Sequence, residues 1–388
     1  MNSYRLLLFA AVLSLMGLSC GPDIGNIGTP DHTLKPFAEN PRYWQYKGRP
    51  VLLLGGSKND NLFQSDSLKE HLDDLEAVGG NFIRNTMSSR DERDIWAYGM
   101  VDGKYDLDRW NDGYWDKLEY LLRLCDERDI IVQMELWDRF DFSREEWLLN
   151  PFHPDNNINY TQEESPFEVV YPNHPGADHQ PFFHSIPGMP KYGEKLMPIL
   201  KYQERYVNKF LSITLKYENI LYCMNNETTS PVTWGNHWIT YIREKAEEQG
   251  KTVFLTDMYD DFHKPSSCQR CHDLIAHPGF YTFMDISQIN SRNFGQAHWD
   301  TLQYILGLRD QYPLRPANHT KVYGGMNSQW GSGSNDDGVE RFCRNVIGGA
   351  AAVRHHRPDY GNGLNDKAKS SIRASRILSG QVNLWEMK

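Results

Sequence analysis

The stretch that decides the fold is Asn219-Ile-Leu-Tyr-Cys-Met-Asn-Asn-Glu227, an apolar run that ends in two amides and a carboxylic acid. A strand buried on both faces of a parallel sheet shows such a continuous apolar pattern. In a β/α barrel the C-terminal ends of these strands open into the active site. The run therefore predicts a buried strand that presents Glu227 at a functional surface. A loop glutamate that happens to follow a strand is the alternative.

Short apolar runs recur along the chain and alternate with amphipathic helical patterns. The eight expected strands are residues 51–54, 81–87, 130–138, 219–227, 253–258, 283–288, 321–327 and 350–356. The expected helices are residues 67–78, 114–127, 199–217, 237–249, 298–309, 339–347 and a closing helix at 367–378. Strands that alternate with helices predict βαβ units and a parallel sheet. Eight strands favour a closed (β/α)₈ TIM barrel over an open doubly wound sheet.

The chain has 388 residues, which suits a single barrel with long loops. We expect the barrel at residues 39–388, with a small N-terminal hairpin at residues 41–50 that caps its bottom. Two long segments, residues 140–198 and 259–279, follow the third and fifth strands. Both belong to the C-terminal face, where barrel enzymes build their sites.

The N-terminus has the pattern of a signal peptide. Arg5 precedes an apolar run at residues 6–18, which is too short to span a bilayer, and Ser19 and Cys20 follow. The pattern resembles the lipobox of bacterial lipoproteins, although Gly17 and Leu18 depart from its usual residues. We expect a signal peptide at residues 1–20, lipidation of Cys20, a tether at residues 21–38, and a lipid anchor in the bacterial cell envelope. An ordinary secreted protein is the alternative.

Five cysteines follow Cys20, an odd number at irregular spacing that is not a disulfide framework. Cys268-Gln-Arg-Cys271-His272 matches the c-type haem attachment pattern. A loop disulfide or free thiols are the interpretation we favour, and a zinc site with His263 and His277 is another alternative. No cofactor and no metal is expected.

Composition narrows the class of partner. The chain has 41 basic and 51 acidic residues, and this net charge of −10 argues against nucleic acid. Aromatic residues make up 13% of the chain, which suits the apolar faces of sugars, although a large aromatic core would give the same composition.

Acidic side chains gather at the predicted strand ends. Cleavage of a glycosidic bond needs two carboxyl groups across the bond, one acid and one nucleophile or base. The candidates beside Glu227 are Glu135 and Asp138 on the third strand and Asp285 on the sixth. Any one of them alone could be a salt bridge or a helix cap. The candidate substrate-binding residues are Asn226, Arg84, Asn85, Trp137, Gln288, Asn327, His355, His356 and Arg357.

With these residues in view, the chain resembles the clan A glycoside hydrolases, which fold as (β/α)₈ barrels. The resemblance rests on Arg84 in the second strand, Asn226-Glu227 at the end of the fourth and the order of the elements. It implies that Glu227 is the acid/base and that Asn226 binds the sugar hydroxyl beside the broken bond. Residues 330–358 resemble cellulase-like lipoproteins of polysaccharide-degrading bacteria, a match that transfers no mechanism.

One departure affects the mechanism. The clan places a nucleophilic glutamate at the end of the seventh strand, but residues 322–330 contain no carboxylate. We therefore expect a glycosidase that cleaves a complex polysaccharide, with Glu227 as a general acid of raised pKa and its partner on another strand. Glu135 and Asp138 are the first choices for that partner, followed by Asp285. A catalytically inactive, glycan-binding barrel is the alternative function.

Overall fold

Eight parallel strands form the centre of the molecule in the computed structural model, which describes residues 33–173, 180–290, 294–324, 331–358 and 363–386. The strands are β4 (Leu53–Ser57), β5 (Phe82–Thr86), β8 (Ile131–Asp138), β9 (Ile220–Asn226), β10 (Phe254–Thr256), β11 (Met284–Asp285), β12 (Ala317–Tyr323) and β13 (Ala352–His356). They pair in the order β10-β9-β8-β5-β4-β13-β12-β11. The Thr282 amide, just before β11, donates to the Leu255 carbonyl of β10 at 2.9 Å and joins the two ends of the sheet. The predicted single (β/α)₈ barrel is thus confirmed.

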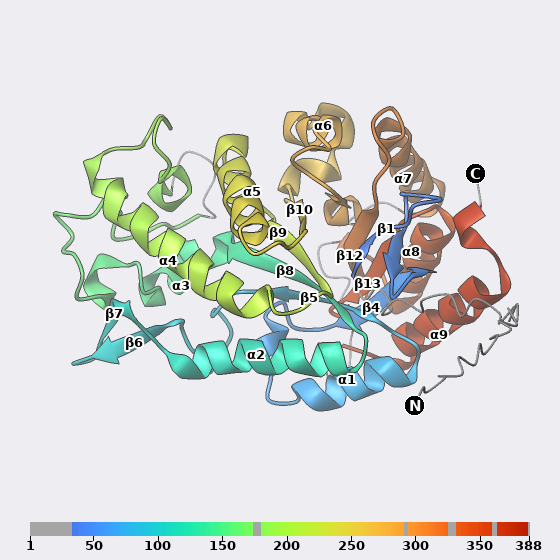
Figure 1. The fold of residues 1–388 in the computed structure, drawn as a ribbon, viewed down its shortest axis with the longest axis horizontal. Helices are drawn as coiled ribbons and strands as arrows, with labels where there is room; N and C mark the ends of the chain where they lie inside the picture. Colours follow the sequence, from blue (N-terminus) through green and yellow to red (C-terminus); the bar gives the residue numbers. More distant parts are fainter. Residues whose placement is uncertain (1–32, 174–179, 291–293, 325–330, 359–362, 387–388) are drawn as a thin grey trace, which may run out of the picture.

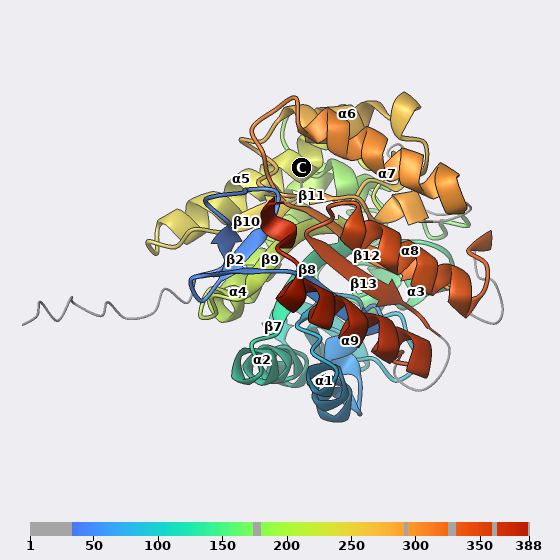
Figure 2. The same ribbon diagram turned by 90° about the vertical axis from the view of Figure 1, so that its right-hand side faces the viewer.

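Helices surround the barrel on its outside, as Figures 1 and 2 show from two directions. They are α1 (Leu68–Ala77), α2 (Asp112–Glu127), α4 (Met197–Thr214), α5 (Val232–Glu247), α6 (Gln269–Ala276), α7 (Gly295–Arg309), α8 (Asn335–Ile347) and α9 (Asp366–Gln381). Each predicted helix has a counterpart among them, and α6 is additional. Within the described residues, no helix has the length and apolar character needed to cross a bilayer.

The predicted hairpin is part of a small three-stranded sheet made of β1 (Lys35–Pro36), β2 (Trp44–Tyr46) and β3 (Arg49–Val51). Lys47 and Gly48 both have positive φ, 50° and 73°, as the tight turn of a two-residue hairpin requires. Trp44 packs edge-on against Phe254 and Phe283 at the bottom of the barrel. The hairpin therefore closes that end, as its position in the sequence predicted.

The interior of the barrel changes from apolar at the bottom to polar further up. Apolar side chains at the bottom pack together with Trp44: Leu53, Phe82, Ile131, Leu221, Phe283 and Ala352. Above them, Gln133 donates to Asp285 at 2.6 Å and accepts from Asn318 at 3.1 Å. Asn318 also accepts from the Trp44 indole at 2.9 Å. Because these buried polar groups bind one another, the barrel can carry a polar layer without a large desolvation penalty.

Two strand predictions were wrong in position. The seventh strand was expected at residues 321–327 and lies at Ala317–Tyr323. Its first half, Ala-Asn-His-Thr, looks too polar for a buried strand, but Asn318 and Thr320 bind polar partners inside the barrel. The first strand was expected at residues 51–54 and lies at Leu53–Ser57, because Val51 belongs to β3.

The connections that follow β5 and β8 are long and structured. A hairpin of β6 (Tyr98–Val101) and β7 (Lys104–Trp110), which the sequence did not predict, precedes α2. The segment after β8 contains the short helix α3 (Arg144–Leu149) and an aromatic cluster around Phe142, Trp147 and Phe182. In Figure 1 the hairpin and α3 lie at the same end of the molecule. Both connections leave from the C-terminal ends of their strands.

Candidate active site

A buried carboxylate, Asp60, is the centre of the ion-pair network at the mouth of the barrel. It lies three residues beyond the end of β4 and is 4% exposed. Its oxygens accept from Arg84 and Arg357, each at 2.5 Å, and from Arg90, and His356 lies 3.5 Å away. Burial alone would raise the pKa of Asp60, but the three guanidinium groups and His356 outweigh it and hold this pKa well below its usual value. Asp60 is therefore an ionised counter-ion.

Both carboxylate oxygens of Glu135 accept hydrogen bonds from neighbouring side chains. Arg84 Nε donates to its Oε1 at 2.5 Å, and Thr86 Oγ1 donates to its Oε2 at 2.6 Å. Both Arg84 and Glu135 are 0% exposed. The geometry gives Glu135 the place of a counter-ion to Arg84 inside the barrel rather than a place at its mouth.

Glu227 lies directly after β9, in the left-handed region at φ 53°. Positive φ is uncommon for a non-glycine residue, and such strain is found at functional sites. Its Oε1 accepts from Lys321, and Arg139 Nη2 lies 3.7 Å from its Oε2. Its side chain is 17% exposed, so the carboxylate is reachable from the mouth.

The predicted raised pKa of Glu227 is wrong. Burial raises it, but the charges of Lys321 and Arg139 outweigh burial, and hydrogen bonds from Lys321 and Gln288 lower it further, to about 2. Glu227 is therefore ionised at neutral pH. A carboxylate in this state can act as a nucleophile or as a base, but it has no proton to donate.

Lys321 is the functional residue that sequence reasoning missed most clearly. Lys321 lies near the C-terminal end of β12, the seventh barrel strand. The expected boundaries of that strand, residues 321–327, put Lys321 at its N-terminal end instead. The Lys321 ammonium also donates to Asn226 Oδ1 at 2.6 Å. The seventh strand thus places a buried cation against Glu227.

Asp138 and Asp141 form a second acidic group beside Glu227. Asp138 ends β8 and pairs in register with Asn226 of β9, so Asp138 and Glu227 lie at the same rim. Burial raises the pKa of Asp138 despite the ion pair with Arg90 and a hydrogen bond from Asn226. Burial, together with the charge of Asp138, raises the pKa of Asp141 well above its usual value. The pKa of each of these two neighbouring acids is therefore shifted upward, and that of Asp141 the more strongly.

A cavity of about 40 Å³ lies against these two acids. Rings of Trp96, Tyr98, Trp137, Phe142, Phe152 and Tyr206 line it together with Asp138 and Asp141. Its aromatic walls account for part of the burial that raises both pKa values. Asp138 is among the residues that line the cavity, and its side chain is 0% exposed to solvent.

Several predicted substrate-binding residues lie away from the mouth. Asn85 accepts from the Phe63 amide at 2.8 Å, outside the barrel, and His355 binds Ser371 at 2.7 Å and stacks on Phe342. Trp137 packs against Tyr206, Trp234 and Trp238 of α4 and α5.

The remaining candidates divide between the barrel interior and its mouth. Asp285 is held inside the barrel by Gln133 and Ser287, and burial raises its pKa to about 6. Gln288, His356 and Arg357 are at the mouth through their contacts with Glu227 and Asp60. Asn327 lies outside the described residues.

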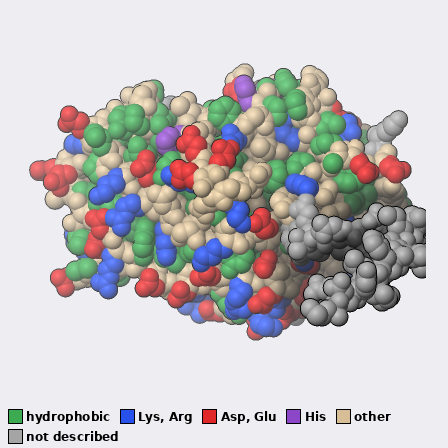
Figure 3. Space-filling view, viewed as in Figure 1, with side chains coloured by type: hydrophobic (Ala, Val, Ile, Leu, Met, Phe, Trp, Pro, Cys, Tyr) green, Lys and Arg blue, Asp and Glu red, His purple; other side chains and the backbone are tan. Residues whose placement is uncertain are grey.

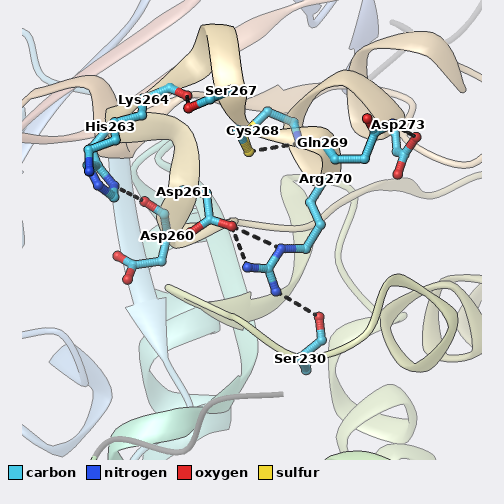
Figure 4. Close-up of a disulfide and its surroundings, with 11 residues drawn as sticks. Ser230, Asp260, Asp261, His263, Lys264, Ser267, Cys268, Gln269, Arg270 and Asp273 are labelled. Carbon is cyan, nitrogen blue, oxygen red and sulfur yellow. Dashed lines mark hydrogen bonds and ion pairs between the residues drawn. A yellow bond between two sulfur atoms is a disulfide. The ribbon is translucent and has the colours of Figure 1, made fainter. Parts of the chain in front are cut away.

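The loop that follows Glu227 is held by Arg270 of α6 (Figure 4). Arg270 donates to the carbonyls of Thr229 and Ser230 and binds Asp261 with its Nε at 3.1 Å. Cys268 and Cys271, which flank Arg270, form a disulfide at the start of α6. The loop disulfide was one of the favoured interpretations, and thiols joined in this way cannot attach a haem. In the ranges that the structure covers, no group of three or more His, Cys, Asp or Glu side chains is placed to hold a metal ion.

Several solved structures that align with this chain are glycoside hydrolases. The endo-1,4-β-mannanase of Rhizomucor miehei aligns with a TM-score of 0.61 and 10% identity over 90% of this chain and 100% of its own. The family 5 mannosidase of the same organism aligns with a TM-score of 0.59 and 13% identity over 92% and 100%. A family 5 glycoside hydrolase of Bacteroides vulgatus aligns with a TM-score of 0.52 and 13% identity over 90% and 71%. No protein-family model and no curated protein sequence matches this chain.

These alignments confirm the resemblance to clan A glycoside hydrolases at the level of the fold. At 10–13% identity they establish the barrel and its topology. The substrates that the names of the neighbours give belong to the neighbours, since fold alone does not fix function.

Proposed function

We propose that the protein is a glycoside hydrolase that cleaves O-glycosidic bonds in a complex polysaccharide. The observation that carries this proposal is a pair of carboxyl groups at one rim with opposite pKa shifts. The pKa of Glu227 is lowered to about 2, while that of Asp138 is raised. Environments that push two carboxyl pKa values apart define an acid and a base in glycosidases. The shared fold of family 5 enzymes adds support.

In the proposed mechanism Asp138 replaces Glu227 as the acid. Asp138 donates its proton to the glycosidic oxygen while the bond between this oxygen and the anomeric carbon breaks. Glu227 either attacks the anomeric carbon or takes a proton from the attacking water. Water supplies the oxygen of the new hydroxyl group and the proton that restores Asp138. The sum of the steps is hydrolysis.

Asn226 links the two acids. It donates to Asp138 and accepts from Lys321, which in turn binds Glu227. This chain of contacts fixes the two carboxyl groups relative to each other, and positioning of this kind can supply a large part of a rate enhancement. The mouth is therefore organised before a substrate arrives.

The test is a screen of the purified protein against plant, algal and host polysaccharides, with new reducing ends as the readout. We expect release from at least one polymer, and loss of that release in Asp138→Asn and Glu227→Gln. Release that survives both substitutions would refute the proposed roles.

Glycan binding without hydrolysis is the second candidate. The observation in its favour is that Lys321 and Arg90 already bind Glu227 and Asp138, the two acids that would react. Native gels that contain each polysaccharide separate the two candidates. Retardation without any new reducing ends would favour the binding protein.

Replacement of Lys321 by methionine should change the pH dependence of hydrolysis. The active form needs ionised Glu227, so activity is lost as pH falls through the pKa of Glu227. With Lys321 present this pKa is about 2. Without Lys321, burial dominates and the pKa rises, so the acid limb of the kcat/KM profile should move up into the range of about pH 4 to 6.

The matched control is Lys216→Met, because Lys216 pairs with Glu119 on the exposed surface at 2.8 Å. It should leave the profile unchanged. A Lys321→Met protein that is folded and keeps the profile of the wild type would show that Lys321 does not set the charge of Glu227.

We also propose that the protein is anchored in the bacterial cell envelope through a lipid on Cys20. The support is the short apolar run that precedes Cys20 in the sequence. In cells that produce the full chain, Cys20→Ala should move the protein from the membrane fraction to the soluble one. A Cys20→Ala protein that remains in the membrane fraction would contradict the lipid anchor.

A further inference from the structure

Two arginines at the mouth have a donor that no described residue uses. Arg139 directly follows β8, and Arg357 directly follows β13. The Nε of each is buried and has no hydrogen-bond partner among the described residues. An unpaired donor on a charged group is costly to bury, which makes both groups exceptions that need an explanation.

The remaining contacts of these arginines are with carboxylates. Arg139 Nη2 lies 3.2 Å from Asp260 and 3.7 Å from Glu227, and Arg357 Nη2 lies 2.5 Å from Asp60. Asp60 is already shared with Arg84 and Arg90, so one carboxylate faces three guanidinium groups. The side chain of Arg357 is 35% exposed, so a ligand can reach it from solvent.

Phe140 holds the arginines in place. The guanidinium carbons of Arg90 and Arg139 each lie 5.0 Å from the centre of its ring. Contacts of this kind orient a guanidinium group without using its N–H donors. Arg357, Asp60, Arg90, Phe140 and Arg139 thus form a continuous series of contacts along the mouth, with donors left free at its two ends.

We propose that the mouth recognises a negatively charged group on the substrate, so that the polysaccharide is acidic rather than neutral. This inference rests on the proposed function, because it assigns the substrate of the same site. A carboxylate of a uronic acid and a sulfate ester share the required chemistry, since both accept paired N–H donors from arginine.

Long-range attraction cannot provide this recognition. The chain carries a net charge of −10, which repels a polyanion at a distance. On the face that Figure 3 shows, basic and acidic side chains are interspersed, without a broad basic surface. Selectivity for an acidic glycan must therefore come from local contacts with Arg139 and Arg357.

The test uses native gels that contain matched pairs of charged and neutral polymers. The carboxylate pairs are polygalacturonate with its methyl ester, and alginate with its carboxyl-reduced form. The sulfate pair is a sulfated galactan with its desulfated form. We expect the wild type to bind at least one charged member at least about 10-fold more tightly than its neutral partner, and the pair that responds identifies the group.

Substitutions separate recognition at the mouth from unspecific binding. Arg139→Gln and Arg357→Gln should each weaken binding of the charged polymer at least about 10-fold and that of the neutral polymer by less than about 3-fold. Arg139→Lys keeps the charge and removes the planar fork, and should also weaken binding. Arg205→Gln on α4, where Arg205 binds Asp108 at the surface, is the control and should bind as the wild type does. Thermal unfolding of each variant establishes that it is folded.

Each outcome bears on the inference. Equal binding of charged and neutral polymers, binding of neutral ones alone, or no binding of any charged polymer would overturn it. So would folded Arg139 and Arg357 variants that bind as the wild type does. Hydrolysis of a neutral mannan without binding of acidic polymers would support the proposed glycosidase activity and refute the proposed acidic substrate. Binding of an acidic polymer without new reducing ends would support the proposed acidic ligand and refute the proposed glycosidase activity.

Discussion

Turnover of a cleaved polysaccharide should fall at least about 10²-fold when Glu227 is replaced by glutamine. The amide keeps the shape of the side chain but cannot act as a nucleophile, and it is too weak a base to activate water. The same change removes the negative charge that Lys321 faces, although the amide oxygen of glutamine can still accept from the Lys321 ammonium. The rate is measured as new reducing ends per unit time at saturating substrate, and unfolding is followed in parallel.

Glu119→Gln is the matched control for this substitution. Glu119 also accepts from a lysine, Lys216, at 2.8 Å, but both side chains are about half exposed, with Glu119 on α2 and Lys216 two residues beyond the end of α4. Its turnover should equal that of the wild type. If the folded Glu227→Gln protein also kept its turnover, Glu227 would only hold the loop that follows β9.

The largest effect on stability is expected for Arg84→Met. Arg84 is 0% exposed, and its guanidinium group donates through Nε to Glu135, through Nη1 to Asp60 and through Nη2 to Thr86. Removal of one member of a buried ion pair leaves an uncompensated charge and typically costs about 3–5 kcal/mol. The free energy of unfolding from urea titration should fall by about this amount.

Arg123→Met is the control for Arg84→Met. Arg123 pairs with Glu127 one turn further along α2, and its side chain is 53% exposed. Exposed pairs of this kind contribute about 0.3–0.5 kcal/mol, so the free energy of unfolding should hardly change. An Arg84→Met protein that loses less than about 1 kcal/mol would show that the network around Asp60 does not stabilise the barrel.

Much of the fold could be predicted from apolar runs, because most barrel strands are buried on both faces. The run that ends at Glu227 and the run at residues 130–138 became β9 and β8. The seventh strand was misplaced because its inward side chains, Asn318 and Thr320, bind polar partners that come from other strands. The sequence of the strand itself contains no pattern that indicates those partners.

The prediction of the site was limited by long-range pairing. Glu227, Asp138 and Arg357 were found because they follow apolar strands. Lys321 was missed, and with it the sign of the pKa shift of Glu227, because the two residues are 94 positions apart. Asp60 was missed because β4 ends later than expected, at Ser57.

Some errors in the site could have been avoided from the sequence. Asn85 follows Arg84 in the same strand, and successive side chains of a strand point to opposite faces. If Arg84 points into the barrel, Asn85 must point outward, where it binds the Phe63 amide. The same alternation separates His355 from His356 on β13.

In the proposed mechanism Asp138 supplies the proton and ionised Glu227 is its partner. The most direct test compares a native glycosidic bond with a dinitrophenyl glycoside of the same sugar, whose leaving group departs without a proton. The Asp138→Asn protein should lose at least about 10²-fold in turnover on the native bond and regain most of that turnover on the dinitrophenyl glycoside. The Glu227→Gln protein should remain slow on both substrates. Recovery of the Glu227→Gln protein, with Asp138→Asn slow on both substrates, would show that the two roles are reversed and contradict the account.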